Sequence, residues 1–132
     1  MPEPEFPDRG ILWRGWNEET VKIIKEKDRP VLLFVADPDP LVFPFLREIF
    51  REMPKNARLR ALLRETYVAL YVEAAALPQE LKLPGAGETY HVAVLSPYGM
   101  TPLVTFAVVT GKPAELVDEI VRVLERLLET WR

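Results

Sequence analysis

The sequence predicts an α/β protein in which helices pack on both faces of a mixed sheet. Residues 31–36 form a short, continuous apolar run, which is typical of a strand buried on both faces. Two later apolar segments, 90–95 and 103–109, flank the turn residues 96–99 and predict an antiparallel hairpin. The segment that follows Pro113 carries apolar side chains at intervals of three and four, which indicates an amphipathic closing helix.

The first predicted helix covers residues 16–27. Asn17 is placed as its N-cap, and the two glutamates that follow lie at the positive end of the helix dipole. The sequence Asp28-Arg29-Pro30 ends this helix before the apolar strand begins. After the strand, Asp37-Pro38-Asp39-Pro40 predicts a stiff loop, because each proline restricts both itself and the residue before it.

Two further helices and a second strand are expected next. Residues 41–53 have apolar positions on one helical face, and Pro44 lies near the start of this helix or kinks it. Helical spacing resumes over 57–65, and the aromatic and branched residues of 67–73 predict a strand. The following stretch predicts at most one helical turn, around residues 79–82.

The composition and net charge of the chain limit the classes of function that it could have. The chain has 132 residues, and 17 basic against 20 acidic residues give a formal charge of −3, so we expect no nucleic-acid partner. No segment approaches the roughly 20 apolar residues that span a bilayer, and residues 1–14 lack the features of a signal peptide, which together suggest a cytoplasmic protein without a membrane partner. Few amides and many Arg, Glu and Pro residues suggest a thermophilic source. The basic side chains that alternate with acids on the predicted helices are expected to be solvated: Lys22, Lys25, Lys27, Arg58, Arg60 and Arg64.

The order of these elements resembles the thioredoxin-like family. Residues 27–34 (KDRPVLLF) resemble the entry to the family's central strand, and Ser96-Pro97-Tyr98-Gly99 resembles its hairpin turn. Trp13 and Trp16, with the glutamates that follow them, look most like bacterial thioredoxin-like domains of the YyaL and spermatogenesis-associated type. The resemblance covers residues 13–128.

The resemblance implies a three-layer α/β/α sandwich with a mixed sheet of four to five strands, a C-terminal β-hairpin and a closing helix. We expect an N-terminal extension over residues 1–15 and a single domain over 16–132. The chemistry of the family does not follow, because the chain has no cysteine. Disulfide exchange requires a thiolate as nucleophile and leaving group, so thiol-disulfide oxidoreductase activity is excluded.

Two positions of the family's reaction centre are altered. The tetrapeptide that replaces the C-x-x-C motif is either 36–39 (ADPD) or 40–43 (PLVF), depending on how the two sequences are aligned. The slot of the family's cis-proline holds Tyr90, after Thr89. A cis bond before a residue other than proline costs about 2.5 to 4 kcal/mol, so we expect a trans bond there.

The function expected from these observations is that of a non-redox protein-binding or assembly module, in which the partner is another protein or a second copy forming a homodimer. No catalytic residue, cofactor or metal is expected. The segment 41–45 is apolar at nearly every position, which suggests either an exposed patch formed by Leu41 and Phe43 or a helix buried on two sides. The candidate binding surface consists of Asp37, Pro38, Asp39, Pro40, Leu41, Phe43, Tyr90 and His91.

The alternative is a metal-dependent or acid-base hydrolytic enzyme that uses Asp37, Asp39 and His91. The loop after the first strand and the start of the third strand are neighbours in the expected fold, so these side chains are predicted to converge. Two carboxylates and an imidazole are able to bind a metal or transfer a proton. A simpler interpretation is that His91 is a hydrogen-bonded strand residue and that Asp-Pro-Asp-Pro is turn chemistry.

Overall fold

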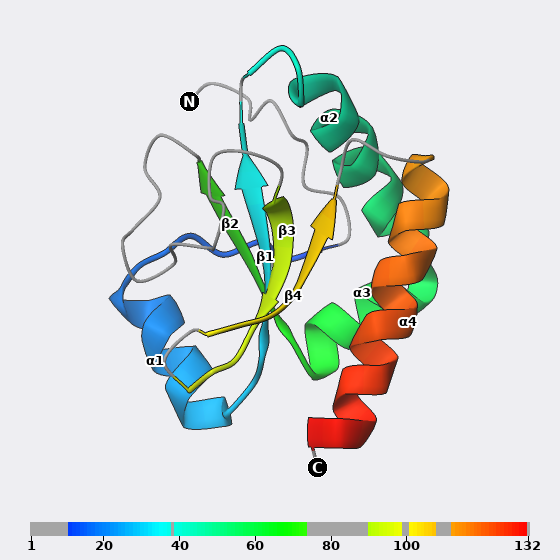
Figure 1. Cartoon of the computed structure of the whole chain (residues 1–132). Coiled ribbons are helices and arrows are strands. Elements are labelled where there is room, and N and C mark those ends of the chain that lie inside the picture. Colours follow the sequence, from blue (N-terminus) through cyan, green and yellow to red (C-terminus); the bar gives the residue numbers. More distant parts are fainter. Residues whose placement is uncertain (1–10, 38, 74–89, 99–100, 108–111, 132) are drawn as a thin grey trace.

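The computed structural model describes residues 11–37, 39–73, 90–98, 101–107 and 112–131. Within these ranges the chain forms a four-stranded mixed sheet with helices on both faces (Figure 1). The elements, in chain order, are α1 (Glu18–Lys27), β1 (Val31–Ala36), α2 (Phe43–Glu52), the 3₁₀ helix η1 (Met53–Lys55), α3 (Ala57–Glu65), β2 (Val68–Glu73), β3 (Tyr90–Leu95), β4 (Pro102–Ala107) and α4 (Pro113–Trp131). The α/β class, the closing hairpin and the last helix are confirmed.

The strand order of the sheet is β2-β1-β3-β4. β1 runs parallel to β2, with Val31 opposite Val68, and antiparallel to β3, with Val31 opposite Leu95. β1 is therefore an internal strand, and all six of its residues are buried, as the continuous apolar run predicts. β3 and β4 pair antiparallel, and their register shifts by one residue at His91.

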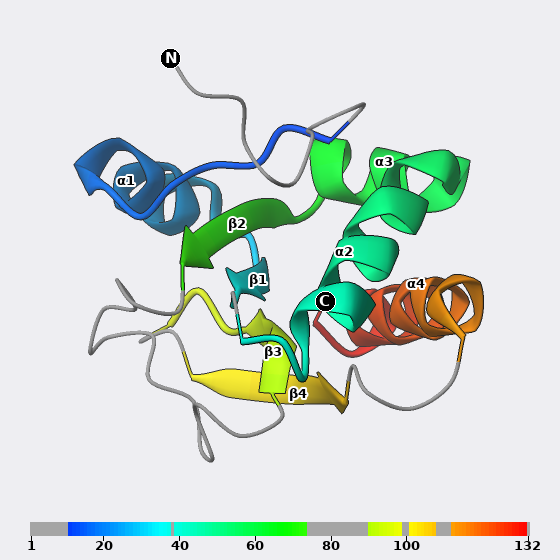
Figure 2. The same cartoon turned by 90° about the horizontal axis from the view of Figure 1, so that it is seen from above.

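Side chains alternate between the two faces of the sheet and build two cores. Leu32 and Phe34 lie on the face covered by α2, α3 and α4, whereas Leu33 and Val35 lie on the face covered by α1 (Figure 2). Burying one such side chain contributes about 1.5 to 3 kcal/mol, so the larger core provides most of the hydrophobic stabilisation. Phe34 also packs against an aromatic cluster, with its ring centroid 4.9 Å from that of Phe50.

The segment that precedes α1 adds to the β2 edge. Arg14 forms an isolated parallel bridge with Leu70: its N–H donates to the Ala69 carbonyl at 2.9 Å, and its carbonyl accepts from the Tyr71 N–H at 2.8 Å. Ile11 is buried in the larger core. Residues 11–15, which lie in the predicted N-terminal extension, therefore contact the sheet.

The helix ends follow local chemistry. The side chain of Asn17 caps α1 by accepting the Thr20 N–H at 2.9 Å, as predicted, and Asn56 caps α3 by accepting the Leu59 N–H at 3.0 Å. Asp28 ends α1 in the left-handed conformation, with φ of 54°. Within the described ranges, no helix combines the length and the apolar character needed to cross a bilayer.

Several predicted boundaries differ from the structure. The helix expected from Trp16 begins at Glu18, because Asn17 is its N-cap. The helix expected from Leu41 begins at Phe43, because residues 40–42 form a turn, and its last predicted residue, Met53, belongs to η1. The strand expected from Tyr67 begins at Val68, because the Tyr67 N–H still donates to a carbonyl of α3. β4 begins at Pro102, one residue earlier than predicted. The predicted turn at 79–82 lies outside the described residues.

Candidate functional site

Hydrogen bonds accepted by two aspartate side chains hold the loop between β1 and α2. Oδ1 of Asp37 accepts the Asp39 N–H at 3.0 Å, and Oδ1 of Asp39 accepts the Leu41 N–H at 3.0 Å. The Asp39 carbonyl accepts the N–H groups of Val42 at 3.0 Å and Phe43 at 2.8 Å. The side chains of Asp37 and Asp39 therefore make successive Asx-type hydrogen bonds, which satisfy backbone donors before the helix starts.

A hydrogen bond between Asp37 and His91 links this loop to β3. Nε2 of His91 lies 2.9 Å from Oδ2 of Asp37, and the imidazole is buried, with 3% of the residue exposed. Nδ1 of His91 is also buried and has no hydrogen-bond partner among the described residues. The tautomer with hydrogen on Nε2 fits this geometry best, because Nε2–H then donates to the carboxylate and the buried Nδ1 is an acceptor rather than an unpaired donor.

The environment of Asp37 favours its charged form. Partial burial raises the pKa of this carboxyl group, but the hydrogen bonds from the Asp39 N–H and from His91 outweigh burial and hold the pKa below its ordinary value. The side chain retains 17% exposure, so one side of it still meets solvent. Asp37 is therefore an ionised anchor for the loop at neutral pH.

The predicted surface residues fall into different environments. Asp39, Pro40 and Leu41 are exposed, Asp37 is partly buried, and His91 is buried and thus does not suit a docking surface. Pro38 and the side chain of Tyr90 lie outside the described part of the structure, as does Thr89, so the predicted trans bond before Tyr90 is not described.

The apolar patch at the start of α2 has a different composition from the predicted one. Leu41 is 77% exposed, as predicted, but Phe43 is half-buried and packs against the larger core. The second exposed apolar side chain is Phe45, at 38%. Periodicity predicts that Phe45 shares the apolar face of Leu46 and Ile49, so its exposure corrects that expectation. Phe45 lies at the edge of the stripe that Leu46, Ile49 and Phe50 bury.

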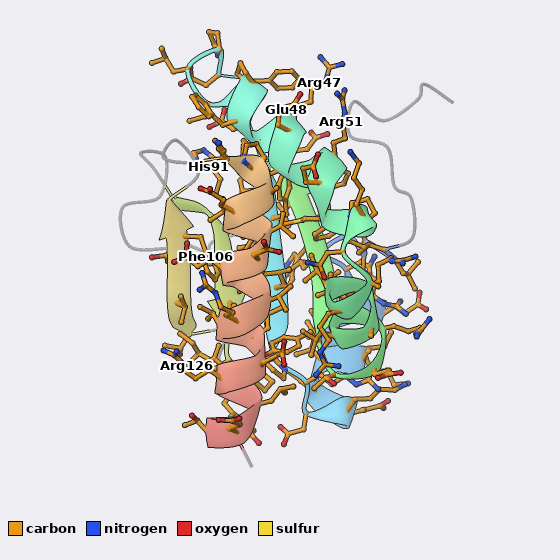
Figure 3. The ribbon with its side chains drawn as sticks, turned by 90° about the vertical axis from the view of Figure 1, so that its right-hand side faces the viewer. Arg47, Glu48, Arg51, His91, Phe106 and Arg126 are labelled. Carbon is orange, nitrogen blue, oxygen red and sulfur yellow. The ribbon has the colours of Figure 1, made fainter. Side chains whose placement is uncertain are left out.

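The remainder of the outer face of α2 is charged. Arg47, Glu48 and Arg51 project from it, and Nη1 of Arg51 lies 3.5 Å from Oε1 of Glu48 (Figure 3). Exposed apolar side chains of α2 are therefore confined to its first turn. We use the name corner surface for the exposed residues Asp39, Pro40, Leu41 and Phe45.

The geometry tests the alternative site of two aspartates and one histidine. Asp37 and His91 converge, as predicted, whereas the carboxylate of Asp39 is turned to the Leu41 N–H. In the described part of the chain, no group of three His, Cys, Asp or Glu side chains is placed to hold a metal ion. The close pair is suited to fastening the loop, because Nε2 is engaged by Asp37 and Nδ1 is shielded from any substrate.

Comparisons with known proteins give no assignment. No model of a protein family matches the chain, and no curated protein matches it. The class that the structure defines is a mixed α/β fold, and the absence of cysteine from the 132 residues excludes disulfide exchange by their own side chains.

Proposed function

We propose that this chain is a thioredoxin-like domain without redox chemistry that binds a protein partner through the corner surface. The element order supports the thioredoxin-like part of the proposal: an early helix, a β-α-β unit, a hairpin and a closing helix. In that family the redox motif follows the central strand, and the corner surface likewise follows β1. The binding role rests on one observation, the 77% exposure of Leu41 on a hydrogen-bonded loop.

The construction of the loop explains why exposure of a leucine there suits binding. A flexible loop loses conformational entropy when a partner orders it, which weakens binding. The turns built by Asp37 and Asp39 hold the backbone beside Leu41, and His91 anchors the first of them to β3. The loop is therefore ordered before a partner arrives, and an apolar anchor on a preorganised loop is a feature of protein interfaces.

Site-specific photo-crosslinking tests this proposal. A photo-reactive phenylalanine analogue replaces Leu41 in one variant and Leu12 in a control variant, since Leu12 is also highly exposed, at 69%, but lies at the other end of β1. Both proteins are irradiated in extracts of the source organism and, separately, as purified protein. We expect a discrete crosslinked product from position 41 and none from position 12. A product of twice the chain mass in the purified sample identifies a second copy as the partner.

A matched pair of charge variants completes the test. Leu41→Glu is expected to abolish the crosslinked product formed from a reporter at Phe45, whereas Leu12→Glu leaves it unchanged. Folding of Leu41→Glu is expected to be unaffected, because a carboxylate near the start of α2 meets the positive end of the helix dipole. Equal products from positions 41 and 12, or a product that survives Leu41→Glu, would contradict the proposal.

A hydrolytic function that uses Asp37, Asp39 and His91 is the second candidate, and the 2.9 Å contact between Asp37 and His91 is the observation that favours it. Both imidazole nitrogens are buried, and this makes the hydrolytic function the weaker of the two proposals. Metal analysis of the purified protein and hydrolase screening of wild type against His91→Phe test it. Hydrolysis that is lost in His91→Phe, with folding retained, would favour this candidate over the binding module.

A further inference from the structure

A cavity of about 300 Å³ lies beside the start of β2, between the ends of α1 and α3. The segment 11–16 runs between these two helices along β2 (Figure 2). The cavity has the size of a small-molecule site. The residues that line it are Ile11, Leu12, Arg14, Ile23, Lys27, Arg29, Arg60, Leu63, Arg64, Tyr67, Val68 and Ala69.

The charge of this lining is one-sided. Five of the described lining residues are cationic, four of them arginines, and none is acidic. Among the described residues, Arg64 forms an ion pair with Glu65, whose Oε1 lies 3.8 Å from its Nη2, and both of these side chains are exposed, so their attraction is weak. Asp28 lies between two of the cations in sequence but accepts a hydrogen bond from Tyr98 at 2.5 Å.

The negative ends of two helices explain why some of these cations gather here. α1 and α3 both end beside the cavity, and each helix end carries about half a negative charge that attracts basic side chains. Nη1 of Arg29 donates to the Arg64 carbonyl at 3.4 Å, in the last turn of α3. When Glu65 and the two helix ends are subtracted from the five cations of the described lining, an excess of about three positive charges remains among the described groups. Neither helix capping nor ion pairing among the described residues explains Arg14 and Arg60.

The inner wall of the cavity is apolar. Ile11, Leu63, Val68 and Ala69 are buried, and the buried ring of Tyr67 is held by the hydrogen bond from its hydroxyl group to the Leu124 carbonyl at 2.7 Å. Guanidinium groups match the oxygens of phosphate with paired hydrogen bonds, and several cations suit a dianion better than a monoanion. We propose that this cavity binds a small phosphate ester that carries an apolar group.

This site is separate from the corner surface. β1 and β2 are parallel and start side by side at Val31 and Val68, where the cavity lies, whereas the corner surface follows the other end of β1. The inference therefore does not depend on the proposed protein-binding role. Lys27, Arg60 and Arg64 are exposed, as expected from the sequence, and all three also line this one concave site.

Titration calorimetry of the full chain with three defined probes tests the proposal. The probes are hexyl phosphate, inorganic phosphate and hexanol, at about 50 mM NaCl so that exposed charges are incompletely screened. We expect saturable binding of hexyl phosphate that is at least about tenfold tighter than that of either fragment, since each fragment uses half of the lining. At ten times its dissociation constant, hexyl phosphate is expected to raise Tm by about 5 °C.

Charge-neutralising variants locate the binding site. Arg14→Gln and Arg60→Gln are each expected to weaken hexyl phosphate binding about tenfold, the usual effect of losing a hydrogen bond to a charged group. Arg58→Gln is the matched control. Arg58 lies on α3, as Arg60 does, but its Nε lies 3.6 Å from Oε1 of Glu125 and it does not line the cavity. The two cavity variants are expected to be as stable as wild type or more stable, because they relieve repulsion. Arg29→Gln is expected to lose stability, because Arg29 donates to the end of α3.

Three results would overturn the inference. The first is the absence of saturable hexyl phosphate binding. The second is an equal loss of binding in Arg58→Gln, which would show diffuse attraction by surface charge. The third is hexanol binding as tight as that of hexyl phosphate, which would show that the cations do not contribute.

Discussion

The contact between Asp37 and His91 leads to the most detailed prediction, a coupling energy that depends on pH. Asp37→Ala leaves Nε2 of the buried imidazole without its partner, and an unsatisfied buried polar group costs about 1 to 3 kcal/mol. The same change also removes the acceptor of the Asp39 N–H. We therefore expect Asp37→Ala to lower the free energy of unfolding by about 2 to 3 kcal/mol. His91→Phe should cost less, about 1 kcal/mol, because it also removes the unpaired Nδ1.

A double-mutant cycle isolates the coupling between Asp37 and His91. The bond from the Asp39 N–H is lost in the single variant Asp37→Ala and also in the double variant, so its contribution cancels. The double variant is expected to be about 1.5 kcal/mol more stable than the two single changes added together, the usual contribution of a hydrogen bond to a charged group. The free energies come from urea unfolding followed by tryptophan fluorescence at pH 7. Asp39→Ala is the control, and its coupling to His91→Phe should be near zero.

The sign of the pH dependence follows from the lowered pKa of Asp37. A group whose pKa is lower in the folded than in the unfolded state stabilises the fold above its unfolded pKa, so this contribution is complete above about pH 4. It is lost as the pH falls through the lower pKa of the folded state. A coupling energy below about 0.5 kcal/mol at pH 7, or one that persists unchanged under acid conditions, would refute this account of the pair.

Three further predictions concern stability. Tyr67→Phe removes the buried hydroxyl group that bonds to the Leu124 carbonyl, and it should lower the free energy of unfolding in urea by about 1 to 2 kcal/mol; an unchanged value would mean that water replaces the bond. Alanine at either helix cap, Asn17 or Asn56, should cost about 1 kcal/mol by the same measurement, and serine at each position should restore most of it. Gly15→Ala should raise Tm slightly, by the equivalent of about 0.4 to 1 kcal/mol, because nothing lies within 4 Å of the added Cβ; a fall would indicate backbone strain there.

Much of the fold was predictable because its signals are local. The run Val31–Ala36 is apolar throughout and lies between turn residues, and the same boundaries appear in the structure. The start of α2 was not predictable in this way. Periodicity extends the helix to Leu41, but the carboxylate of Asp39 accepts the Leu41 N–H and forms a turn, so side-chain chemistry overrides the pattern.

The candidate site was predictable in part. Neighbouring strands brought Asp37 and His91 together as expected, but the burial of His91 was not foreseen. His91 lies where the register between β3 and β4 shifts, between Tyr90 and Val92, and no local sequence signal marks such an irregularity. The basic cavity was missed for a similar reason. Arg14 and Arg60 belong to distant segments that only the tertiary fold brings together.

The backbone bridge between Arg14 and Leu70 also protects one edge of the sheet from pairing with other chains. An edge strand presents unpaired backbone groups that are able to template the addition of a strand from another chain, which leads to aggregation. On the outer side of β2, the Ala69 carbonyl and the Tyr71 N–H are occupied by Arg14, so this edge is already covered at its middle. A shortened chain that begins after residue 16 would uncover both groups beside buried Leu70, and it would be more prone to edge-to-edge association than the full chain.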